Sequence, residues 1–375
     1  MIIGILKETG SEKRVTMLPD MVKILTGLKV QLLVEKGAGD SVFVSDNEYV
    51  EAGAEISDRQ SLLQKSDLIV FINQLSSNEI QQIGATKVLV GAMNPYVNLD
   101  GVKQLMAQKV TSFSLELVPR TSRAQSMDIL SSMATITGYR AVLDAAFHLP
   151  RFFPMFMSAA GTIKPAKVLI LGAGVAGLQA IAISRKLGAV VEVFDVRSAV
   201  KEEVKSLGGK FIEVEGAIED ANAGGYAVEQ TEEFKQKQTQ LIQDHAVKAD
   251  VVICTAQIPG RRAPLLVKKS TVEQMRKGSI IIDLAASSGG NCELTKDDQT
   301  IVHEGVKIIG NSYYPTDMQI DASAMFGRNV VNLLKLFITE DGNLDLNFED
   351  DIIKGTCLTK DGEIVNERVK SMIDK

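Results

Sequence analysis

The sequence has no tryptophan and only three histidines and three cysteines in 375 residues. Cys254, Cys292 and Cys357 lie far apart in the chain and form no CxxC pair. Cysteines spaced in this way are typical of reduced thiols in a cytosol-like compartment. The ligand spacings of a zinc site and the pattern of a Ser/His/Asp triad are also missing from the sequence. We therefore predict neither a metal site nor a disulfide framework.

Long apolar runs are missing as well. The most apolar tract, residues 147–170, is interrupted by basic residues and prolines, so it lacks the ~18 uninterrupted apolar residues of a membrane-spanning helix. The N-terminus lacks the basic segment and cleavage site of a signal peptide, and we expect it to form a strand. A net charge of −6 disfavours nucleic acid and anionic lipid as the main partner. These features predict a globular protein that does not insert into a membrane directly.

The most informative stretch is KVLILGAGVAGLQA at residues 167–180, where an apolar run meets glycines with GxGxxG spacing. This pattern is typical of a strand, a phosphate-binding turn and the helix that follows. We predict that Gly172 allows the turn, Gly174 lets a pyrophosphate approach the backbone and Gly177 lets the helix lie close to the strand. The helix would begin near Val175, with its positive dipole end toward the phosphates. We assign the whole segment to the cofactor site, that is Gly172, Ala173, Gly174, Val175, Ala176 and Gly177; an empty structural βαβ unit is the alternative.

A second predicted strand, residues 190–194, ends at Asp195, where a carboxylate can accept both ribose hydroxyls of an adenosine. A carboxylate also repels a 2′-phosphate, which favours NAD(H) over NADP(H). Arg197 complicates this choice, because an NADP site uses an arginine near this corner. In an NAD site Arg197 would instead cover the adenine or cap the next helix. We therefore include Asp195, Val196 and Arg197 in the predicted cofactor site.

Strands alternate with helical patterns along the whole chain, which predicts parallel βαβ units. We expect an α/β fold of two Rossmann-like domains with parallel sheets, separated by a cleft that holds the active site. Helical patterns near 128–147 and 321–337 would cross between the domains, so the first domain would be discontinuous. The predicted boundaries are residues 1–130 and 319–375 for the first domain and residues 131–318 for the Rossmann NAD(H)-binding domain.

Two segments do not fit this alternation. Residues 147–161 carry four phenylalanines and two methionines beside two prolines, and would form an arm buried against a second copy of the chain or in the chain's own interdomain seam. Residues 216–230 are small, flexible and acidic with one aromatic residue, Tyr226. They would form a mobile lid or an idle surface loop.

Candidates for acid/base chemistry are few. His148, His245 and His303 each favour a structural or solvated role. The densest polar cluster, residues 116–128, follows a predicted strand and includes Arg120, Arg123, Gln125 and Asp128. These side chains suit a carboxamide and a ribose, although Ser126 or Asp128 could also cap the next helix.

Five motifs in the chain carry a resemblance to a known family: GILKETGSEKRVTMLP near the start, RTSRAQSMD, GAGVAGLQA, FDVR and YYPTDM. Over almost its whole length the chain resembles the NAD(H)-binding α subunits of proton-translocating nicotinamide nucleotide transhydrogenases, and more distantly alanine dehydrogenases. Alanine dehydrogenases use a lysine and a histidine in the first domain, and the corresponding tracts here, 71–75 and 90–95, contain neither. Their catalytic aspartate is also absent, because the segment after Asp283 has serines.

These absences suit a transhydrogenase, because hydride transfer between two nicotinamides releases no proton at the reacting carbons. The resemblance implies that Arg120, Gln125 and Asp128 are the catalytic residues and that Ser131 joins them at the nicotinamide and its ribose. Gln125 would hold the ring for transfer to NADP on a partner domain. Tyr226 would close over the nucleotide, and Asp195 would hold the adenosine ribose.

The resemblance also implies an NAD(P)+ transhydrogenase of the Si-specific/proton-translocating type, active with partner subunits. NAD(H) would bind here, NADP(H) would bind to a partner domain, and membrane-spanning subunits would couple the transfer to proton movement. The chain would be a homodimer that exchanges the 147–161 arm, peripheral to the cytoplasmic or matrix-like face of an energy-coupling inner membrane. It would be either a stand-alone subunit or a segment of a longer polypeptide. The competing hypotheses are an alanine dehydrogenase-like enzyme and a nucleotide sensor without turnover.

Overall fold

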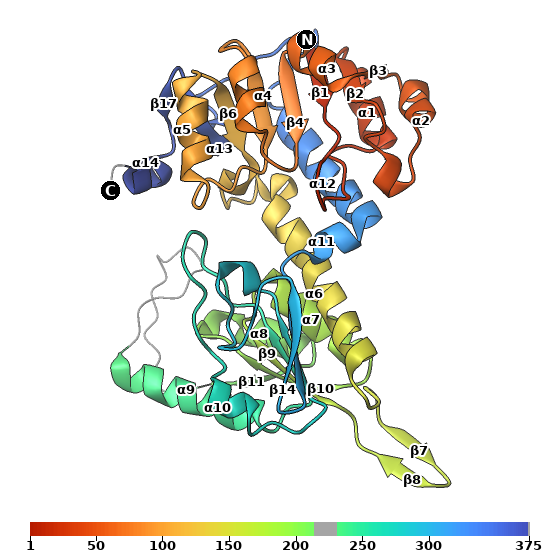
Figure 1. Cartoon of the computed structure of the whole chain (residues 1–375), viewed down its shortest axis with the longest axis vertical. Coiled ribbons are helices and arrows are strands. Elements are labelled where there is room, and N and C mark those ends of the chain that lie inside the picture. Colours follow the sequence, from red (N-terminus) through yellow and green to blue (C-terminus); the bar gives the residue numbers. More distant parts are fainter. Residues whose placement is uncertain (214–230, 374–375) are drawn as a thin grey trace. The chain divides into compact units, whose positions relative to one another are not determined.

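The structure is a computed structural model that describes residues 1–213 and 231–373. The chain forms two compact units, one from Met1–Met133 with Pro315–Lys375 and the other from Ala134–Tyr314. Each unit contains one large sheet with helices around it (Figure 1). The predicted α/β class with two Rossmann-like domains is confirmed, with sheets that are mainly parallel.

The sheet of the first unit has the strand order β17-β16-β6-β5-β4-β1-β2-β3. Its central strands β4 and β5 are buried along their whole length, because parallel strands are covered on both faces. Six parallel strands make up most of it: β1 (Ile2–Ile5), β2 (Gln31–Glu35), β3 (Glu55–Ser57), β4 (Leu68–Phe71), β5 (Val88–Gly91) and β6 (Thr111–Ser114).

Helices of the first unit begin at residues suited to capping. Ser45, Asp58, Ser76 and Asn98 each accept a backbone N–H of the first turn, which satisfies a donor that has no partner in the helix. The helices are α1 (Pro19–Thr26), α2 (Asp46–Glu51), α3 (Arg59–Lys65), α4 (Ser77–Gln82), α5 (Leu99–Ala107), α12 (Gln319–Leu334), α13 (Asp351–Thr356) and α14 (Glu367–Ile373), with the short helices η1 (Asp40–Val42), η2 (Leu115–Leu117) and η3 (Gln125–Met127).

The C-terminal segment adds two antiparallel strands to the first sheet, β16 (Cys357–Lys360) and β17 (Glu363–Ile364). The ring of Phe337 packs on that of Phe113 in β6, with centroids 4.6 Å apart. A buried hydrogen bond of 2.7 Å joins the hydroxyl groups of Ser112 and Thr359. The sequence analysis assigned no strand to β16, which is only four residues long and directly follows α13.

The sheet of the second unit has the order β11-β10-β9-β12-β13-β15-β14. Six of its strands are parallel, and β14 is an antiparallel edge strand whose partly exposed residues form no apolar run. The strands are β9 (Lys167–Leu171), β10 (Val190–Phe194), β11 (Lys210–Ile212), β12 (Val251–Cys254), β13 (Ile280–Asp283), β14 (Gln299–His303) and β15 (Val306–Gly310). The helices are α6 (Ile129–His148), which begins in the first unit, α7 (Val175–Lys186), α8 (Lys201–Ser206), α9 (Glu232–Ala246) and α10 (Lys269–Val272), with η4 (Ser198–Val200) and η5 (Ala286–Ser288). Helix α11 (Tyr314–Asp317) begins at the last residue of the second unit and continues in the first.

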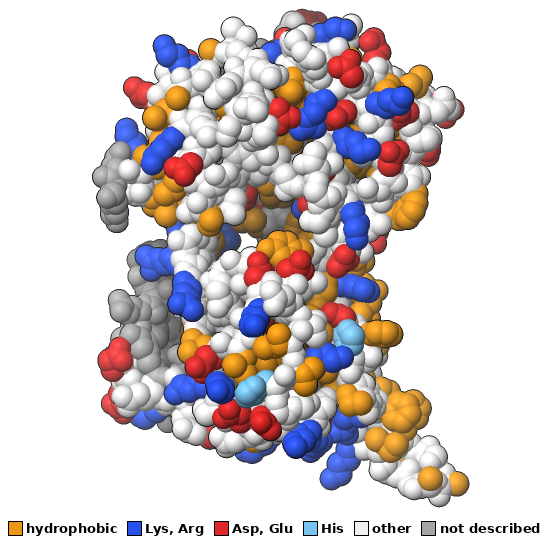
Figure 2. Space-filling model, in the orientation of Figure 1, with side chains coloured by type: hydrophobic (Ala, Val, Ile, Leu, Met, Phe, Trp, Pro, Cys, Tyr) orange, Lys and Arg blue, Asp and Glu red, His pale blue; other side chains and the backbone are white. Residues whose placement is uncertain are grey.

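The predicted arm is a two-stranded hairpin, β7 (Phe156–Ser158) and β8 (Gly161–Ile163), which follows the end of α6. Its strands are exposed along their whole length, and hydrophobic side chains gather on it at the lower right of Figure 2. Five large apolar side chains between residues 152 and 163 are exposed by at least 44%: Phe152, Met155, Phe156, Met157 and Ile163. Phe153 alone of the segment's phenylalanines is buried. Among the helices in the described ranges, none has the length and hydropathy needed to cross a membrane.

Candidate functional site

The glycine turn between β9 and α7 brings a helix unusually close to a strand end. Gly172 has φ +107°, a left-handed conformation that side chains disfavour. An ideal Cβ on Gly177 would lie 2.0 Å from the carbonyl oxygen of Gly172, so α7 can reach this position only with glycine there. Thr255 at the end of β12 donates its hydroxyl to the carbonyl of Gly172 at 3.1 Å. The turn is therefore fixed by the neighbouring strand as well as by its own residues.

Gly174 differs from the other two glycines, because a Cβ built on it would meet nothing within 4 Å. It is the N-cap residue of α7 and has no side chain to satisfy the first N–H groups of the helix. Val175 and Ala176 follow in the first turn, and the carbonyl of Ala176 approaches Gly138 of α6. Backbone donors beside open space suit an anionic group such as a pyrophosphate.

Asp195 lies directly on this turn. Its Oδ2 accepts the backbone N–H of Ala173 at 2.7 Å, and its Oδ1 accepts the backbone N–H of Arg197 at 2.8 Å. The Arg197 guanidinium donates to both oxygens, at 2.9 Å from Nε and 2.8 Å from Nη2. The side chain of Asp195 is only 6% exposed. Strand β10 thus places a carboxylate at the glycine turn, with Val196 half-buried beside it.

The Arg197 guanidinium therefore binds Asp195, a contact that was not predicted from the sequence. The hydrogen bonds and the charge of Asp195 raise the pKa of Arg197, although its partial burial opposes the shift. The positive charge of Arg197, held in this way, compensates the negative charge of the Asp195 carboxylate. The pair leaves no isolated buried charge at the turn, and each oxygen of Asp195 already accepts two hydrogen bonds.

The polar residues of the 120–128 loop belong to the first unit. Arg120 and Gln125 are exposed. Ala124, which lies between them, and Met127, which follows, are buried. Asp128 accepts the backbone N–H of Ser131 at 3.0 Å and its hydroxyl at 2.6 Å, so it caps the start of α6 as the sequence suggested.

The structure brings the predicted residues together in two groups, one on each unit. Asp128 and Ser131 are joined in the first unit, and Ala173, Asp195 and Arg197 are joined in the second. Tyr226 lies outside the described residues. The three cysteines are buried and unbridged, and no group of metal-ligating side chains occurs within 1–213 and 231–373.

The histidines have structural partners. His148 Nδ1 lies 3.0 Å from Lys307 Nζ, His245 Nδ1 lies 2.7 Å from Glu192, and His303 Nε2 lies 3.2 Å from Glu273. Each contact joins elements of the second unit. These contacts agree with the structural role that the sequence favoured.

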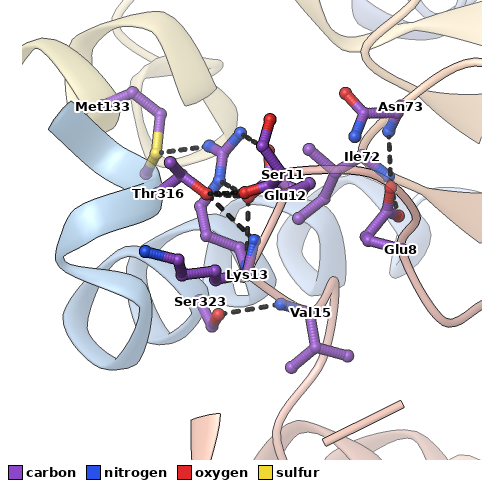
Figure 3. A network of polar contacts seen from close by, with 11 residues as sticks. Glu8, Ser11, Glu12, Lys13, Val15, Ile72, Asn73, Met133, Thr316 and Ser323 are labelled. Carbon is purple, nitrogen blue, oxygen red and sulfur yellow. Dashed lines mark hydrogen bonds and ion pairs between the residues drawn. The ribbon is translucent and has the colours of Figure 1, made fainter. Parts of the chain in front are cut away.

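A second polar cluster lies where the strand order of the first sheet reverses, at the carboxyl ends of β1 and β4 (Figure 3). The Glu8 carboxylate accepts the backbone N–H groups of Ile72 at 2.6 Å and Asn73 at 2.9 Å. Beside it lies a cavity of about 450 Å³, lined by polar side chains that include Arg59 and Gln74. Such a reversal is where open α/β sheets bind ligands.

Figure 3 also shows how the same loop is tied to the returning C-terminal segment. Glu12 pairs with Arg14 at 2.6 Å and accepts the hydroxyl of Thr316 at 2.9 Å. Burial would raise the pKa of Glu12, but hydrogen bonds from Arg14 and Thr316 hold it below its usual range. Ser323 of α12 accepts the backbone N–H of Val15 at 2.9 Å.

The sequence interpretation overlooked Glu8 as an ionisable group. Burial raises its pKa to about 7, against the opposing effect of the two backbone N–H groups. The sequence did contain one signal for this site: Glu8 is a carboxylate in the loop directly after a strand of apolar residues. It was not recognised because the strand order, which puts β4 beside β1, is a property of the fold.

We expect the side-chain carboxyl of Glu8 to titrate with a midpoint of about 7 in a ¹³C NMR pH series, together with the amide signals of Ile72 and Asn73. Because the folded pKa lies above the ordinary value of 4.5, the protonated form favours folding. Its contribution to stability is present below about pH 4.5 and is lost as the pH rises through 7. Exposed Glu48, whose pKa is lowered by hydrogen bonds from Ser45, serves as the control. A Glu8 midpoint near 4.5 would contradict the burial argument.

Comparisons with known proteins match both units. The family model "Alanine dehydrogenase/PNT, N-terminal domain" matches residues 4–137, and "Alanine dehydrogenase/PNT, C-terminal domain" matches residues 141–367. In Rhodospirillum rubrum, the protein named as the first part of NAD(P) transhydrogenase subunit alpha is 44% identical over 98% of each chain. The crystal structure of a transhydrogenase from Sinorhizobium meliloti is similar with a TM-score of 0.88 and 40% identity, over 97% of this chain and 100% of that one. An alanine dehydrogenase of Mycolicibacterium smegmatis is 26% identical over 100% of this chain and 97% of its own.

Proposed function

The chain belongs to the alanine dehydrogenase/PNT family, and on this premise we propose that it is the NAD(H)-binding component of a transhydrogenase. It would pass a hydride between NADH and NADP+ held by a partner domain. The observation that carries this proposal is the carboxylate of Asp195, held on the glycine turn by the backbone N–H of Ala173. A dinucleotide whose ribose carries free hydroxyls fits this arrangement.

The residues of the second unit fit the dinucleotide in three respects. Open space beside Gly174 and the uncapped start of α7 suit the pyrophosphate. The ribose hydroxyls would replace the Arg197 guanidinium on the oxygens of Asp195. In the structure the Arg197 contacts lower the cost of keeping this carboxylate charged, since its side chain is only 6% exposed. When bound, the reduced nicotinamide supplies a hydride with its electron pair.

The first unit would supply the residues at the reacting ring. Gln125 and Arg120 are exposed donors on one loop, and Asp128 and Ser131 form a rigid pair at the start of α6. In our proposal Gln125 orients the carboxamide, and Arg120, Asp128 and Ser131 orient the ring and its ribose. Direct hydride transfer requires close and correct positioning and no general base at the reacting carbons.

Partners complete the proposed activity. NADP(H) would bind to a separate domain, and membrane-spanning subunits would couple hydride transfer to proton translocation. The chain would then lie at the cytoplasmic or matrix-like face of an energy-coupling inner membrane, attached through those subunits. The relative from Rhodospirillum rubrum is itself named as one portion of a subunit, which supports a multi-component assembly.

We also propose that the hairpin joins two copies of the chain. Its exposed apolar side chains, including Phe152 and Met157, form a surface that water disfavours. Of the four phenylalanines in residues 147–161, only Phe153 is buried. Exchange of the hairpin between copies would cover the remaining rings.

A second candidate function is an amino-acid oxidoreductase like alanine dehydrogenase. It is favoured by one observation, the Glu8 carboxyl with a pKa of about 7 beside a cavity in the first unit. Against it, the tracts 71–75 and 90–95 contain no lysine or histidine.

Mutation of Asp195 tests the nucleotide site. Asp195→Ala should weaken NADH binding by about 1–3 kcal/mol, because charge-assisted hydrogen bonds to the ribose are lost. Asp195→Asn, which keeps an acceptor for Ala173, should weaken it less. Glu192→Gln, in the same strand but paired with His245 and Lys210, is the matched control and should leave the affinity unchanged. Calorimetric titration with NADH gives the dissociation constants, and an unaltered value for Asp195→Ala would mean that the ribose binds elsewhere.

Activity assays separate the candidate functions. With NADH and an NADP+ analogue, the chain should reduce the analogue only when a transhydrogenase NADP(H)-binding domain is added. With alanine and NAD+ it should produce no sustained NADH. Sustained NADH production from alanine would overturn the proposal in favour of the amino-acid oxidoreductase. NADH binding without any transfer in the presence of the partner domain would indicate a nucleotide sensor.

The size of the protein in solution tests the hairpin proposal. Replacing Phe152 and Met157 with aspartate should convert a dimer to a monomer in analytical ultracentrifugation, because burying two carboxylates in an apolar interface is strongly unfavourable. Val302→Asp is the control, since Val302 is an apolar side chain of the same unit that is 67% exposed and lies outside the hairpin. If the doubly substituted protein remains dimeric, the interface is formed by another surface.

A further inference from the structure

The 120–128 loop is held by an ion pair whose partners are 227 residues apart in the chain. Arg123 donates from Nη1 to Asp350 Oδ2 at 2.7 Å and from Nη2 to Asp350 Oδ1 at 2.6 Å, and it also contacts Asp351. The sequence offered Arg123 as a donor to a ligand, but in the structure its guanidinium binds these carboxylates. Parallel two-point contacts of this kind restrict the arginine's orientation as well as its position.

Asp350 is itself fixed. Its Oδ1 accepts the backbone N–H groups of Ile352 at 2.8 Å and Ile353 at 3.4 Å, so it caps α13. The hydrogen bonds from Arg123 lower its pKa to about 2, so the carboxylate is charged at neutral pH. Helix α13 leads into β16, which pairs with β6, the strand that precedes the loop. The ion pair therefore links the loop to a rigid part of the first sheet.

Two further contacts support the loop on either side of Arg123. At its start, Pro119 lies against Gly355 of α13, where an added Cβ would come within 2.5 Å of the proline ring. Toward its end, the carbonyl of Ser126 accepts the side-chain amides of Asn329 at 2.8 Å and Asn332 at 3.1 Å, both from α12. Arg123 holds the middle of the loop, between exposed Arg120 and Gln125.

We propose that Arg123 and Asp350 are positioning residues for hydride transfer: their ion pair fixes the backbone that carries Arg120 and Gln125. This inference rests on the proposed function. A misplacement of about 1 Å at a reacting centre can slow a reaction roughly 100-fold, so a positioning contact affects the rate of transfer more than nucleotide affinity. The main proposed affinity contacts, at Asp195 and the glycine turn, lie in the other unit.

The test uses the full chain with a transhydrogenase NADP(H)-binding domain, NADH and an NADP+ analogue. Arg123→Gln removes the ion pair, Arg123→Lys keeps the charge without the two-point contact, and Asp350→Asn keeps an N-cap acceptor but loses the charge. The control Lys103→Gln removes one positive charge from an exposed pair with Asp100 on α5. The transfer rate at saturating NADH, the dissociation constant for NADH and the thermal midpoint are measured for each, with the double variant Arg123→Gln/Asp350→Asn.

We expect Arg123→Gln and Asp350→Asn each to slow transfer by roughly 10-fold or more, with the NADH dissociation constant changed by less than about 3-fold. The double variant should be no slower than the slower single variant, because both remove the same contact. Arg123→Lys should recover part of the rate, and Lys103→Gln should match the wild type. Unchanged rates in both single variants, additive losses in the double variant or a loss confined to NADH affinity would each overturn the inference. A wild-type chain that transfers no hydride would instead remove the proposed function on which it rests.

Discussion

The second unit depends on the close approach of a helix to a strand end. Helix α7 can lie on the end of β9 only because no side chain separates Gly177 from the carbonyl of Gly172, which an added Cβ would approach to 2.0 Å. That approach directs the uncapped N–H groups of the helix toward the open space at Gly174. It also brings the N–H of Ala173 within reach of Asp195, so the glycine turn and the Asp195 carboxylate form one hydrogen-bonded assembly. The proposed nucleotide site is therefore a consequence of packing as much as of side-chain chemistry.

The first unit depends on the return of the C-terminal segment. This segment adds β16 beside β6, packs Phe337 on Phe113 and supplies Asp350, Asn329 and Asn332 to the 120–128 loop. A loop at the end of a strand is ordinarily mobile, because few of its backbone groups are satisfied. Here buried apolar side chains and long-range polar contacts hold it, so exposed Arg120 and Gln125 are carried on a fixed backbone. Preorganisation of this kind suits a reaction in which the protein's task is to position two rings.

Glu8 places a buried carboxyl group at the centre of the first sheet. It lies beside a polar cavity where the strand order of the first sheet reverses, with a carboxyl group whose pKa burial raises to about 7. In the proposed transhydrogenase its clear function is to satisfy the N–H groups of Ile72 and Asn73 at the end of β4. Those groups would otherwise be left without acceptors at a buried strand end. The same location in a related oxidoreductase would be suited to a substrate, and this explains why the alternative function centres on the first unit.

The sequence by itself determined the α/β class, most strands and long helices, the glycine turn and Asp195 at the end of β10. These features follow from local patterns, namely apolar period, glycine spacing and the residue that ends a strand. Other features were decided only by tertiary structure: the antiparallel edges β14 and β16, the pairing of Arg197 with Asp195, the cluster at Glu8 and the ion pair between Arg123 and Asp350. The cluster at Glu8, strand β16 and the Arg123–Asp350 pair each join segments that are distant in the sequence, whereas β14 forms a hairpin with the adjacent β15. Arg197 is only two residues from Asp195, but the two side chains meet because the glycine turn holds the carboxylate in place through the N–H of Ala173. The long-range contacts arise because the strand order and the return of the C-terminal segment to the first unit bring distant residues together. The strand order in turn depends on the packing of the whole core, which no local pattern in the sequence specifies.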